Sequence, residues 1–255
     1  MLLIYSCAFS QSSMIQEYDN ILSLIDRGRN KEAKAELEAF IGKYKDPKLV
    51  PSAMYQLVKL ETNVGKSSDI LNSIVAKYPN STWASISQYK IGEINFLAKH
   101  YEIALRAFEI YLRKYPDGQW KNDALLNSAF CKMQLNKHNE ALTMLETIKE
   151  KDIELNNDPK VFDAIGECQM ILKKYKEAIN TFDTITKRFP NYPFMSKTLF
   201  YKGLALEEQN KLKEAETVYD SLAKTFPSSS QAKVAQSRLN DCKKLNNIMY
   251  NVLSE

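Results

Sequence analysis

Apolar residues recur at intervals of three and four along most of the chain, and short polar or proline-containing segments separate these stretches. The part that ends at Pro190 is typical, with this spacing over residues 162–168 and again over 174–189. Such intervals place the apolar side chains on one side of an α-helix, so the pattern predicts two amphipathic helices. Pro190 is expected to end the second helix, because proline lacks an amide donor and disfavours the helical conformation of the residue before it.

The same unit recurs every 37 residues. A small residue occupies one helix position, an alanine follows 12 residues later, and a proline closes most of the units. The small residues are Gly92, Ala129, Gly166 and Gly203; the alanines are Ala104, Ala141, Ala178 and Ala215; the prolines are Pro79, Pro116, Pro190 and Pro227. A fixed period between about 20 and 50 residues is typical of a solenoid built from repeats.

Small side chains at fixed positions indicate that the two helices of a unit approach closely there. Gly166 and Ala178 are expected at such a crossing, where a larger side chain would push the helix axes apart, with Phe182 filling the space beside them. The unit at residues 121–155 departs from this pattern: it has Ala129 in place of glycine and Leu145 in place of an aromatic residue, and it lacks the proline. Its local turn is therefore expected to differ.

The arrangement resembles the tetratricopeptide repeat, whose pattern is W-x2-L-G-x2-Y, then A-x3-F, then P. The matching positions are Ile91-Gly92, Ala104 with Phe108, and Pro116; Ile165-Gly166, Ala178 with Phe182, and Pro190; and Gly203, Ala215 with Tyr219, and Pro227. The resemblance implies an all-α fold, a right-handed superhelical α-solenoid of about six helix pairs over residues 11–228, the first two degenerate. Residues 229–255 are expected to form a capping helix, because the last repeat of a solenoid otherwise leaves an apolar face bare.

The segments that join successive units share an aromatic residue, a proline and a second aromatic residue. They read Tyr78-Pro79-Asn80-Ser81-Thr82-Trp83 and Tyr115-Pro116-Asp117-Gly118-Gln119-Trp120. This linker is similar to that of repeats in bacterial envelope proteins of the BamD and CpoB type. The resemblance implies a role in outer-membrane or Tol-Pal-type assembly.

The amino-terminal residues are apolar and uncharged. Residues 1–9 are followed by a serine-rich segment, and Ala8 and Ser10 form a small-x-small pattern of the kind cleaved by signal peptidase. Residues 1–10 therefore predict a signal peptide or a lipoprotein signal, with Cys7 as the lipid-bearing residue in the second case. Either would place the protein in the periplasm or on the periplasmic face of the outer membrane. The alternative is a cytoplasmic protein whose first residues are an ordinary terminus.

Charge and composition narrow the classes of function. The 35 Lys and Arg nearly balance the 31 Asp and Glu, and a net charge of only +4 argues against binding nucleic acid. The phosphate-loop and hydrolase motifs are absent, and the two histidines, His100 and His138, have no further ligand or nucleophile at a coherent spacing. We therefore predict no enzyme, cofactor or metal site, and we interpret Cys131, Cys168 and Cys242 as buried packing residues.

A groove lined by the first helix of each pair is the remaining candidate site, since the family resemblance implies that these helices form the concave surface. Apolar, aromatic and acidic residues are expected there, a mixture that suits an extended peptide or an amphipathic helix from a partner protein. The positions are Tyr89, Glu93, Phe96, Leu126, Phe130, Met133, Asp163, Glu167, Met170, Phe200, Leu204 and Glu207. The alternative for any one of them is packing against the neighbouring helix.

The favoured hypothesis is a non-enzymatic interaction scaffold of the cell envelope. The alternatives are a cytosolic scaffold or a regulatory subunit of a larger complex. An enzyme built on the same repeats would need Glu93, Asp163, Glu167 or Glu207 to act with a base or nucleophile that the sequence does not supply.

Overall fold

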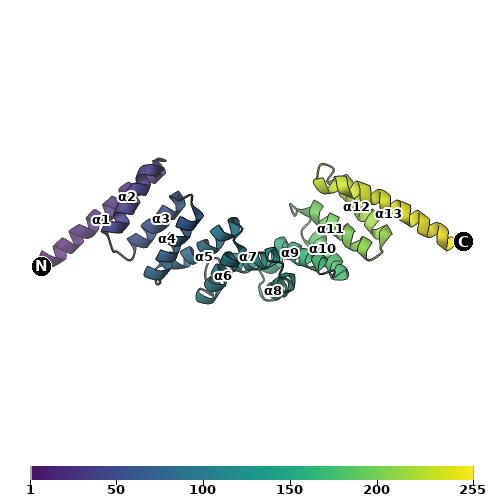
Figure 1. Ribbon diagram of the computed structural model, residues 1–255, viewed down its shortest axis with the longest axis horizontal. Helices are drawn as coiled ribbons and strands as arrows, with labels where there is room; N and C mark the ends of the chain where they lie inside the picture. Colours follow the sequence, from purple (N-terminus) through teal and green to yellow (C-terminus); the bar gives the residue numbers. More distant parts are fainter. Residues whose placement is uncertain (1, 255) are drawn as a thin grey trace. The chain divides into compact units, whose positions relative to one another are not determined.

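The computed structural model describes the backbone of residues 2–254 and the side chains of residues 12–247. Over this range the chain forms thirteen α-helices and one short 3-10 helix, without strands (Figure 1). Their bounds are α1 Leu2–Asp26, α2 Asn30–Lys43, α3 Leu49–Leu60, α4 Val64–Lys77, α5 Thr82–Leu97, α6 Tyr101–Lys114, α7 Lys121–Gln134, α8 His138–Lys151, η1 Leu155–Asn157, α9 Pro159–Ile171, α10 Tyr175–Arg188, α11 Met195–Glu208, α12 Leu212–Thr225 and α13 Ser230–Ser254. The predicted all-α solenoid of six helix pairs and a final helix is confirmed. The handedness of its superhelix stays a prediction.

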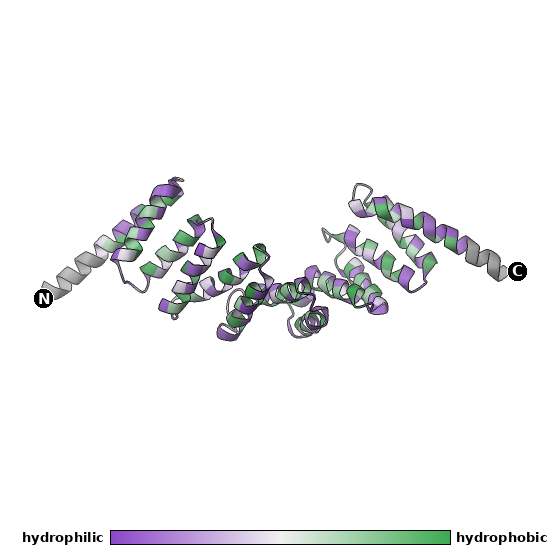
Figure 2. Cartoon of the chain, viewed as in Figure 1, coloured by the Kyte–Doolittle hydropathy of each residue, from purple (hydrophilic) through white to green (hydrophobic). Residues whose placement is uncertain are grey.

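The helices divide into two compact units, Met1–Cys131 and Lys132–Glu255. In the first unit each helix from α1 to α6 packs on the next, and the odd-numbered helices α1, α3 and α5 also contact one another in turn. The second unit repeats this arrangement from α8 to α13, with α9, α11 and α13 in successive contact. Hydrophobic and hydrophilic residues alternate along the helices (Figure 2), and the buried residues among those described are mostly apolar. We call the odd-numbered first helices of the pairs the A helices.

The recurring glycines allow the close crossings that their spacing predicts. A Cβ atom added to Gly92 would lie 2.5 Å from the ring of Phe108, and one added to Gly166 or Gly203 would lie closer still to Phe182 or Tyr219. All three aromatic side chains are fully buried. The aromatic ring of the second helix thus occupies the space where the first helix has no side chain, which confirms the predicted role of the small positions.

The turns inside the pairs follow the same period. Lys99, Asn136, Lys173 and Asn210, each 37 residues from the next, have φ between 56° and 62°. In each turn two backbone N–H groups donate back to the end of the preceding helix; Lys174 N, for example, lies 2.8 Å from the oxygen of Gln169. This is the left-handed cap that commonly ends a helix, here made without glycine.

The segments between pairs also behave as their prolines indicate. The helices α4, α6, α10 and α12 each end two residues before Pro79, Pro116, Pro190 or Pro227. The divergent unit instead ends in the 3-10 helix Leu155–Asn157, after which the Asp158 side chain accepts a hydrogen bond from Lys160 N and caps α9. The expected difference in its local turn is confirmed.

The two terminal helices differ in how far their side chains are described. Helix α1 continues without a break from Leu2 to Asp26, but the side chains of residues 1–11, including Cys7, lie outside the described part. The signal and lipid predictions for residues 1–10 therefore stay predictions. None of the helices, over the residues searched, combines the length and apolar character that a membrane span requires.

Helix α13 covers α12 as the predicted cap. Ser229 accepts a hydrogen bond from Ala232 N at 3.1 Å, so its side chain caps the start of the helix. Ala235, Leu239 and Cys242 are buried against the preceding helices, whereas Val234 is 49% exposed. Val234 therefore lies on a second face of α13, beside α11.

Candidate functional site

The predicted A-helix positions of the first unit are mostly engaged in packing. On α5, Tyr89 is buried and its ring stacks on Trp120, with centroids 5.3 Å apart and an interplanar angle of 11°. Glu93 pairs with Lys90 one turn before it on the same helix. Phe96 is half-buried and meets the edge of Tyr101. Of the three predicted residues on α5, only Glu93 and Phe96 retain surface that a partner could contact.

Helix α7 contributes less surface than its sequence suggests. Leu126 and Met133 are only 8% and 7% exposed, and Phe130 is half-buried. Leu97, at the end of α5, is 73% exposed and was not among the predicted residues. Its position corresponds to Ile171 two periods later, which is 54% exposed at the end of α9. The recurrence of an aliphatic residue at this position, two periods apart, is the sequence feature that could have identified Leu97 and Ile171 as surface residues.

In the second unit the A helices carry a charged cluster that joins α9 to α11. Lys197 of α11 donates to Asp163 at 3.1 Å and also to Glu167, both on α9. Asp163 accepts a second hydrogen bond from the Tyr192 hydroxyl at 3.3 Å. Burial, and then the charge of Asp163, raise the pKa of the Tyr192 hydroxyl, so it stays protonated and remains a donor.

Lys197 is the member of this cluster that the sequence analysis missed. It lies three residues before Phe200 and projects between two acids that were predicted site residues. Burial lowers its pKa, but the hydrogen bonds and charges of Glu167 and Asp163 outweigh burial and raise it. The lysine is therefore a fixed cation on this face, and the two carboxylates leave the cluster with an excess of negative charge.

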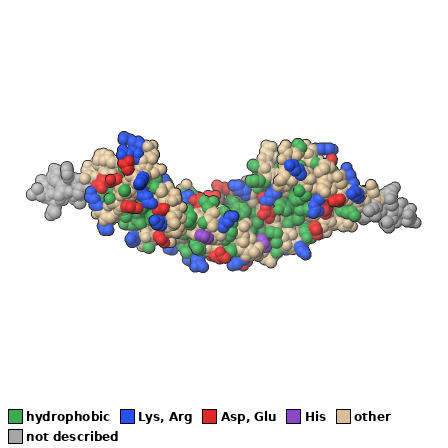
Figure 3. Space-filling model, turned by 45° about the horizontal axis from the view of Figure 1, so that its top comes forward, with side chains coloured by type: hydrophobic (Ala, Val, Ile, Leu, Met, Phe, Trp, Pro, Cys, Tyr) green, Lys and Arg blue, Asp and Glu red, His purple; other side chains and the backbone are tan. Residues whose placement is uncertain are grey.

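An apolar pocket lies next to this cluster, between α11 and the start of α13. It has a volume of about 410 Å³, and its lining residues are Lys197, Phe200, Tyr201, Ser230, Gln231 and Val234. Apolar side chains gather on the surface of the second unit (Figure 3). Met170 and Leu204 are half-buried on α9 and α11, so this face combines apolar surface with the charged cluster. We call this surface the second-unit A face; its residues are Asp163, Glu167, Met170 and Ile171 of α9, Lys197, Phe200, Tyr201 and Leu204 of α11, and Ser230, Gln231 and Val234 of α13.

Glu207, also predicted to face a partner, is held within the fold. It accepts hydrogen bonds from the Tyr219 hydroxyl of α12 and from Arg238 of α13, each at 2.5 Å. Burial, and then Glu207, raise the pKa of Tyr219. Glu207 therefore links its own helix, α11, to α12 and α13.

The residues considered for catalysis or metal binding are not brought together. Cys131 and Cys168 are buried and unbridged, and burial raises the pKa of each thiol to about 12, far from what a nucleophile at neutral pH needs. His100 is exposed beside the start of α6, whereas His138 is half-buried as the first residue of α8. Among the described side chains, no group of three His, Cys, Asp or Glu could hold a metal ion.

Comparison with known proteins places the repeats in a family. Sequence models of the tetratricopeptide repeat match residues 87–118, 123–152 and 172–230. A search of curated protein sequences gave no match.

Solved structures agree with these matches. The chain is similar to YrrB, described as a TPR protein with an unusual peptide-binding site, with a TM-score of 0.59, 17% identity, and coverage of 72% of this chain and 91% of that one. For PilF of Pseudomonas aeruginosa the TM-score is 0.55 and the sequence identity 16%, with coverage of 89% of this chain and 98% of that one. PilW, described as a widely conserved type IV pilus biogenesis factor, gives 0.58 and 14%, over 88% and 98%. At these identities the likeness concerns the fold. The chain therefore contains tetratricopeptide repeats and folds as a helical repeat solenoid.

Proposed function

We propose that the chain is a non-enzymatic protein-interaction scaffold that binds a peptide or an amphipathic helix on the second-unit A face. The observation that carries this proposal is the pocket of about 410 Å³ lined by Phe200, Tyr201 and Val234, with the Lys197 cluster at its edge. A small number of apolar anchors in a pocket supplies most of the binding energy in such interfaces. Fixed charges beside the anchors set orientation and select among partners.

The predicted positions contribute unequally to this proposal. Met170, Phe200, Leu204 and Glu167 retain accessible surface in the second unit, as do Glu93, Phe96 and Phe130 in the first. Tyr89, Leu126 and Met133 are buried, so they would support the surface from below. YrrB shows by its description that a fold of this type can bind a peptide, but the binding residues proposed here are this chain's own.

We expect the double variant Ile171→Glu, Val234→Glu to lose the partner while remaining folded. Both side chains are about half exposed, so charged replacements leave the core intact. They place one acid a turn after Glu167 on α9 and another in the apolar pocket. The test is affinity capture from host extract, quantified by mass spectrometry, with the intact chain and the variant compared. Ile153→Glu is the matched control, because Ile153 is 83% exposed on the loop before η1.

The captured amount of specific partners should fall at least about tenfold with the double variant, which corresponds to a loss of about 1.4 kcal/mol of binding free energy. With the control the captured amount should stay unchanged. Equal capture by the double variant would eliminate this face as the binding site.

The cell envelope is the location that we propose for this scaffold. The apolar residues 1–9 and the small-residue pattern at Ala8 and Ser10 support export, and Cys7 is the candidate for a lipid. The BamD- and CpoB-like linker supports a role in outer-membrane or Tol-Pal-type assembly. Mass spectrometry of the protein purified from its host is expected to find a shortened chain. It would begin at Cys7 if that residue carries a lipid, or after Ser10 if a signal peptide is cleaved at the small-residue pattern. An intact Met1 together with recovery in the cytosolic fraction would favour a cytosolic scaffold or regulatory subunit instead.

A further inference from the structure

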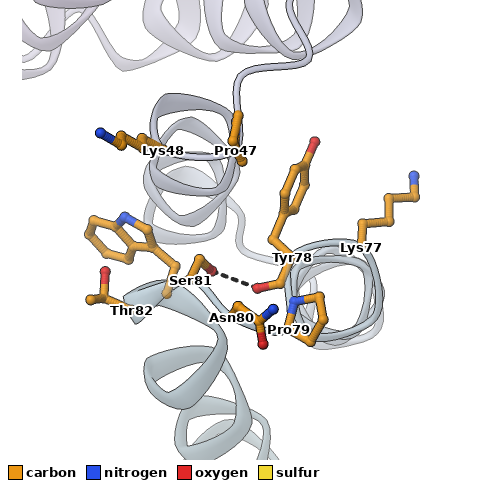
Figure 4. Close-up of a pocket in the computed structure, with 9 residues that line it drawn as sticks. Pro47, Lys48, Lys77, Tyr78, Pro79, Asn80, Ser81 and Thr82 are labelled. Carbon is orange, nitrogen blue, oxygen red and sulfur yellow. Dashed lines mark hydrogen bonds between the residues drawn. The ribbon is translucent and has the colours of Figure 1, made fainter.

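A second pocket lies in the first unit, away from the A-helix positions discussed above. Its volume is about 480 Å³, and its lining residues are Pro47, Lys48, Lys77, Tyr78, Pro79, Asn80, Ser81, Thr82 and Trp83. These residues come from two successive segments between repeats, the loop before α3 and the linker from α4 to α5 (Figure 4). We call this cavity the linker pocket.

The walls of the linker pocket are rings. Pro47, Tyr78, Pro79 and Trp83 all contribute to them, and Trp83 is held in place by Tyr55 of α3, with ring centroids 4.9 Å apart. Grooves lined by aromatic side chains bind proline-containing extended segments, because the rigid proline helix loses little entropy on binding. The volume also falls within the range of sites that accept a small ligand or one or two side chains.

The charged groups around the pocket are the two lysines, Lys48 and Lys77. No Asp or Glu belongs to the lining, and in the described part of the chain neither Lys48 nor Lys77 forms an ion pair. Figure 4 shows Lys48 and Lys77 on opposite sides of the pocket, with their side chains extending outward from its rim. Ser81 donates its hydroxyl hydrogen to the oxygen of Tyr78 at 2.8 Å and does not cap α5. The cavity therefore offers positive charge next to apolar rings.

The next linker does not share these properties. Trp120 lies flat on Tyr89, and its backbone N–H donates to the Tyr111 hydroxyl at 3.1 Å. That linker also carries an acid, Asp117. The two linkers look alike in sequence, but they differ in the tilt between tryptophan and tyrosine, 36° for Trp83 and 11° for Trp120, and in the acid that the second one carries.

We propose that the linker pocket binds an extended acidic segment of a partner protein, in which a proline or aromatic ring lies next to an Asp or Glu. The ring packs between Tyr78 and Trp83, and the carboxylate pairs with Lys48 or Lys77. Charge complementarity selects this occupant over a basic one, since two lysines and no acid line the site. The inference concerns a site other than the second-unit A face and does not depend on the function proposed there.

The probes are fluorescein-labelled hexapeptides Pro-Pro-X-Asp-Glu-Pro, with X as Pro, Phe, Tyr or Trp, and the same peptides with Lys in place of both acids. Binding to the full chain is measured by fluorescence anisotropy. We expect at least one acidic peptide to bind and its basic counterpart to bind at least tenfold more weakly. The variant Lys48→Glu, Lys77→Glu should weaken the acidic peptide by at least tenfold, whereas Lys31→Glu, Lys66→Glu, an equal charge change at exposed lysines of the same unit, should alter it less than twofold.

Nitrogen-15 NMR of the full chain gives the position of binding, with shifts expected at residues 47–48 and 77–83. The inference is overturned by the absence of binding up to about 1 mM peptide, by equal binding of basic peptides, by equal loss in the two lysine variants, or by shifts on the faces of α3 and α5 instead. A second copy of the chain as the occupant would appear as a dimer by sedimentation that Lys48→Glu, Lys77→Glu abolishes, and it would also overturn the proposal. The Ile171→Glu, Val234→Glu variant should leave peptide binding unchanged, so the two proposals fail independently.

Discussion

Gly166→Ala is expected to lower the free energy of unfolding of the second unit by about 2 kcal/mol, within the roughly 1 to 3 kcal/mol typical of an overpacked core. Glycine to alanine inside a helix ordinarily raises stability by up to about 1 kcal/mol, so the sign is informative. The cause is steric: the added Cβ would overlap the ring of Phe182, which is fully buried and stacks on Tyr201 at 6.4 Å.

Both tryptophans of the chain, Trp83 and Trp120, belong to the first unit, so their fluorescence does not report on this change. Native-state hydrogen exchange of the amides in α9 and α10 is the suitable measurement. Gly42→Ala is the matched control, since nothing lies within 4 Å of a Cβ at that position, and exchange of the amides in α2 and α3 measures its effect. It should leave stability unchanged or slightly higher.

A second substitution tests the mechanism directly. The divergent repeat has Ala129 where the others have glycine and Leu145 where they have an aromatic residue. Phe182→Leu combined with Gly166→Ala copies this pair and should recover part of the lost stability, because leucine is smaller and more easily accommodated than the ring. If the double variant is less stable than Gly166→Ala alone, glycine and ring are not coupled in the way the structure indicates.

The fold could be predicted because its determinants are local and periodic. Gly92, Gly166 and Gly203 recur with an aromatic partner 16 residues later, and prolines follow the second helices. These features determine where the helices begin, cross and end, and they act within one helix pair, so they do not depend on contacts with distant parts of the chain. The left-handed turns at Lys99 and its equivalents were not predicted, since lysine and asparagine there lack the signal that glycine would give.

The candidate site could be predicted only in part. A stripe on an A helix faces both the open surface and the neighbouring A helix, and periodicity does not separate the two sides. Both Tyr89 and Phe200 were predicted to line the groove, but the structure buries Tyr89 in packing and leaves Phe200 partly accessible. Lys197 was missed because its role depends on two acids about one repeat earlier. The linker pocket was missed because it forms between two successive loops, again about one repeat apart.

Lys197→Met should lower the stability of the second unit by about 2 kcal/mol at neutral pH. Removing one partner of a fully buried ion pair costs roughly 3 to 5 kcal/mol, because the other charge stays buried without compensation. The expected value here is smaller, since the Lys197 side chain is 30% exposed and Glu167 is 28% exposed and can turn to water. Asp163, with 11% of its side chain exposed, cannot do so, and it would remain between α9 and α11 without a cation.

The matched control is Lys224→Met, which removes an ion pair with Asp220 at 2.6 Å whose side chains are 75% and 43% exposed. Exposed pairs contribute less than about 1 kcal/mol, so this variant should be close to the unmodified chain. Adding Asp163→Asn to Lys197→Met should restore much of the stability, because asparagine is neutral and still accepts the hydrogen bond of Tyr192. Hydrogen exchange in α9 and α11 measures all three variants. A Lys197→Met variant no less stable than Lys224→Met would show that the cluster does not hold the two A helices together, and that these charges are free to rearrange around a partner.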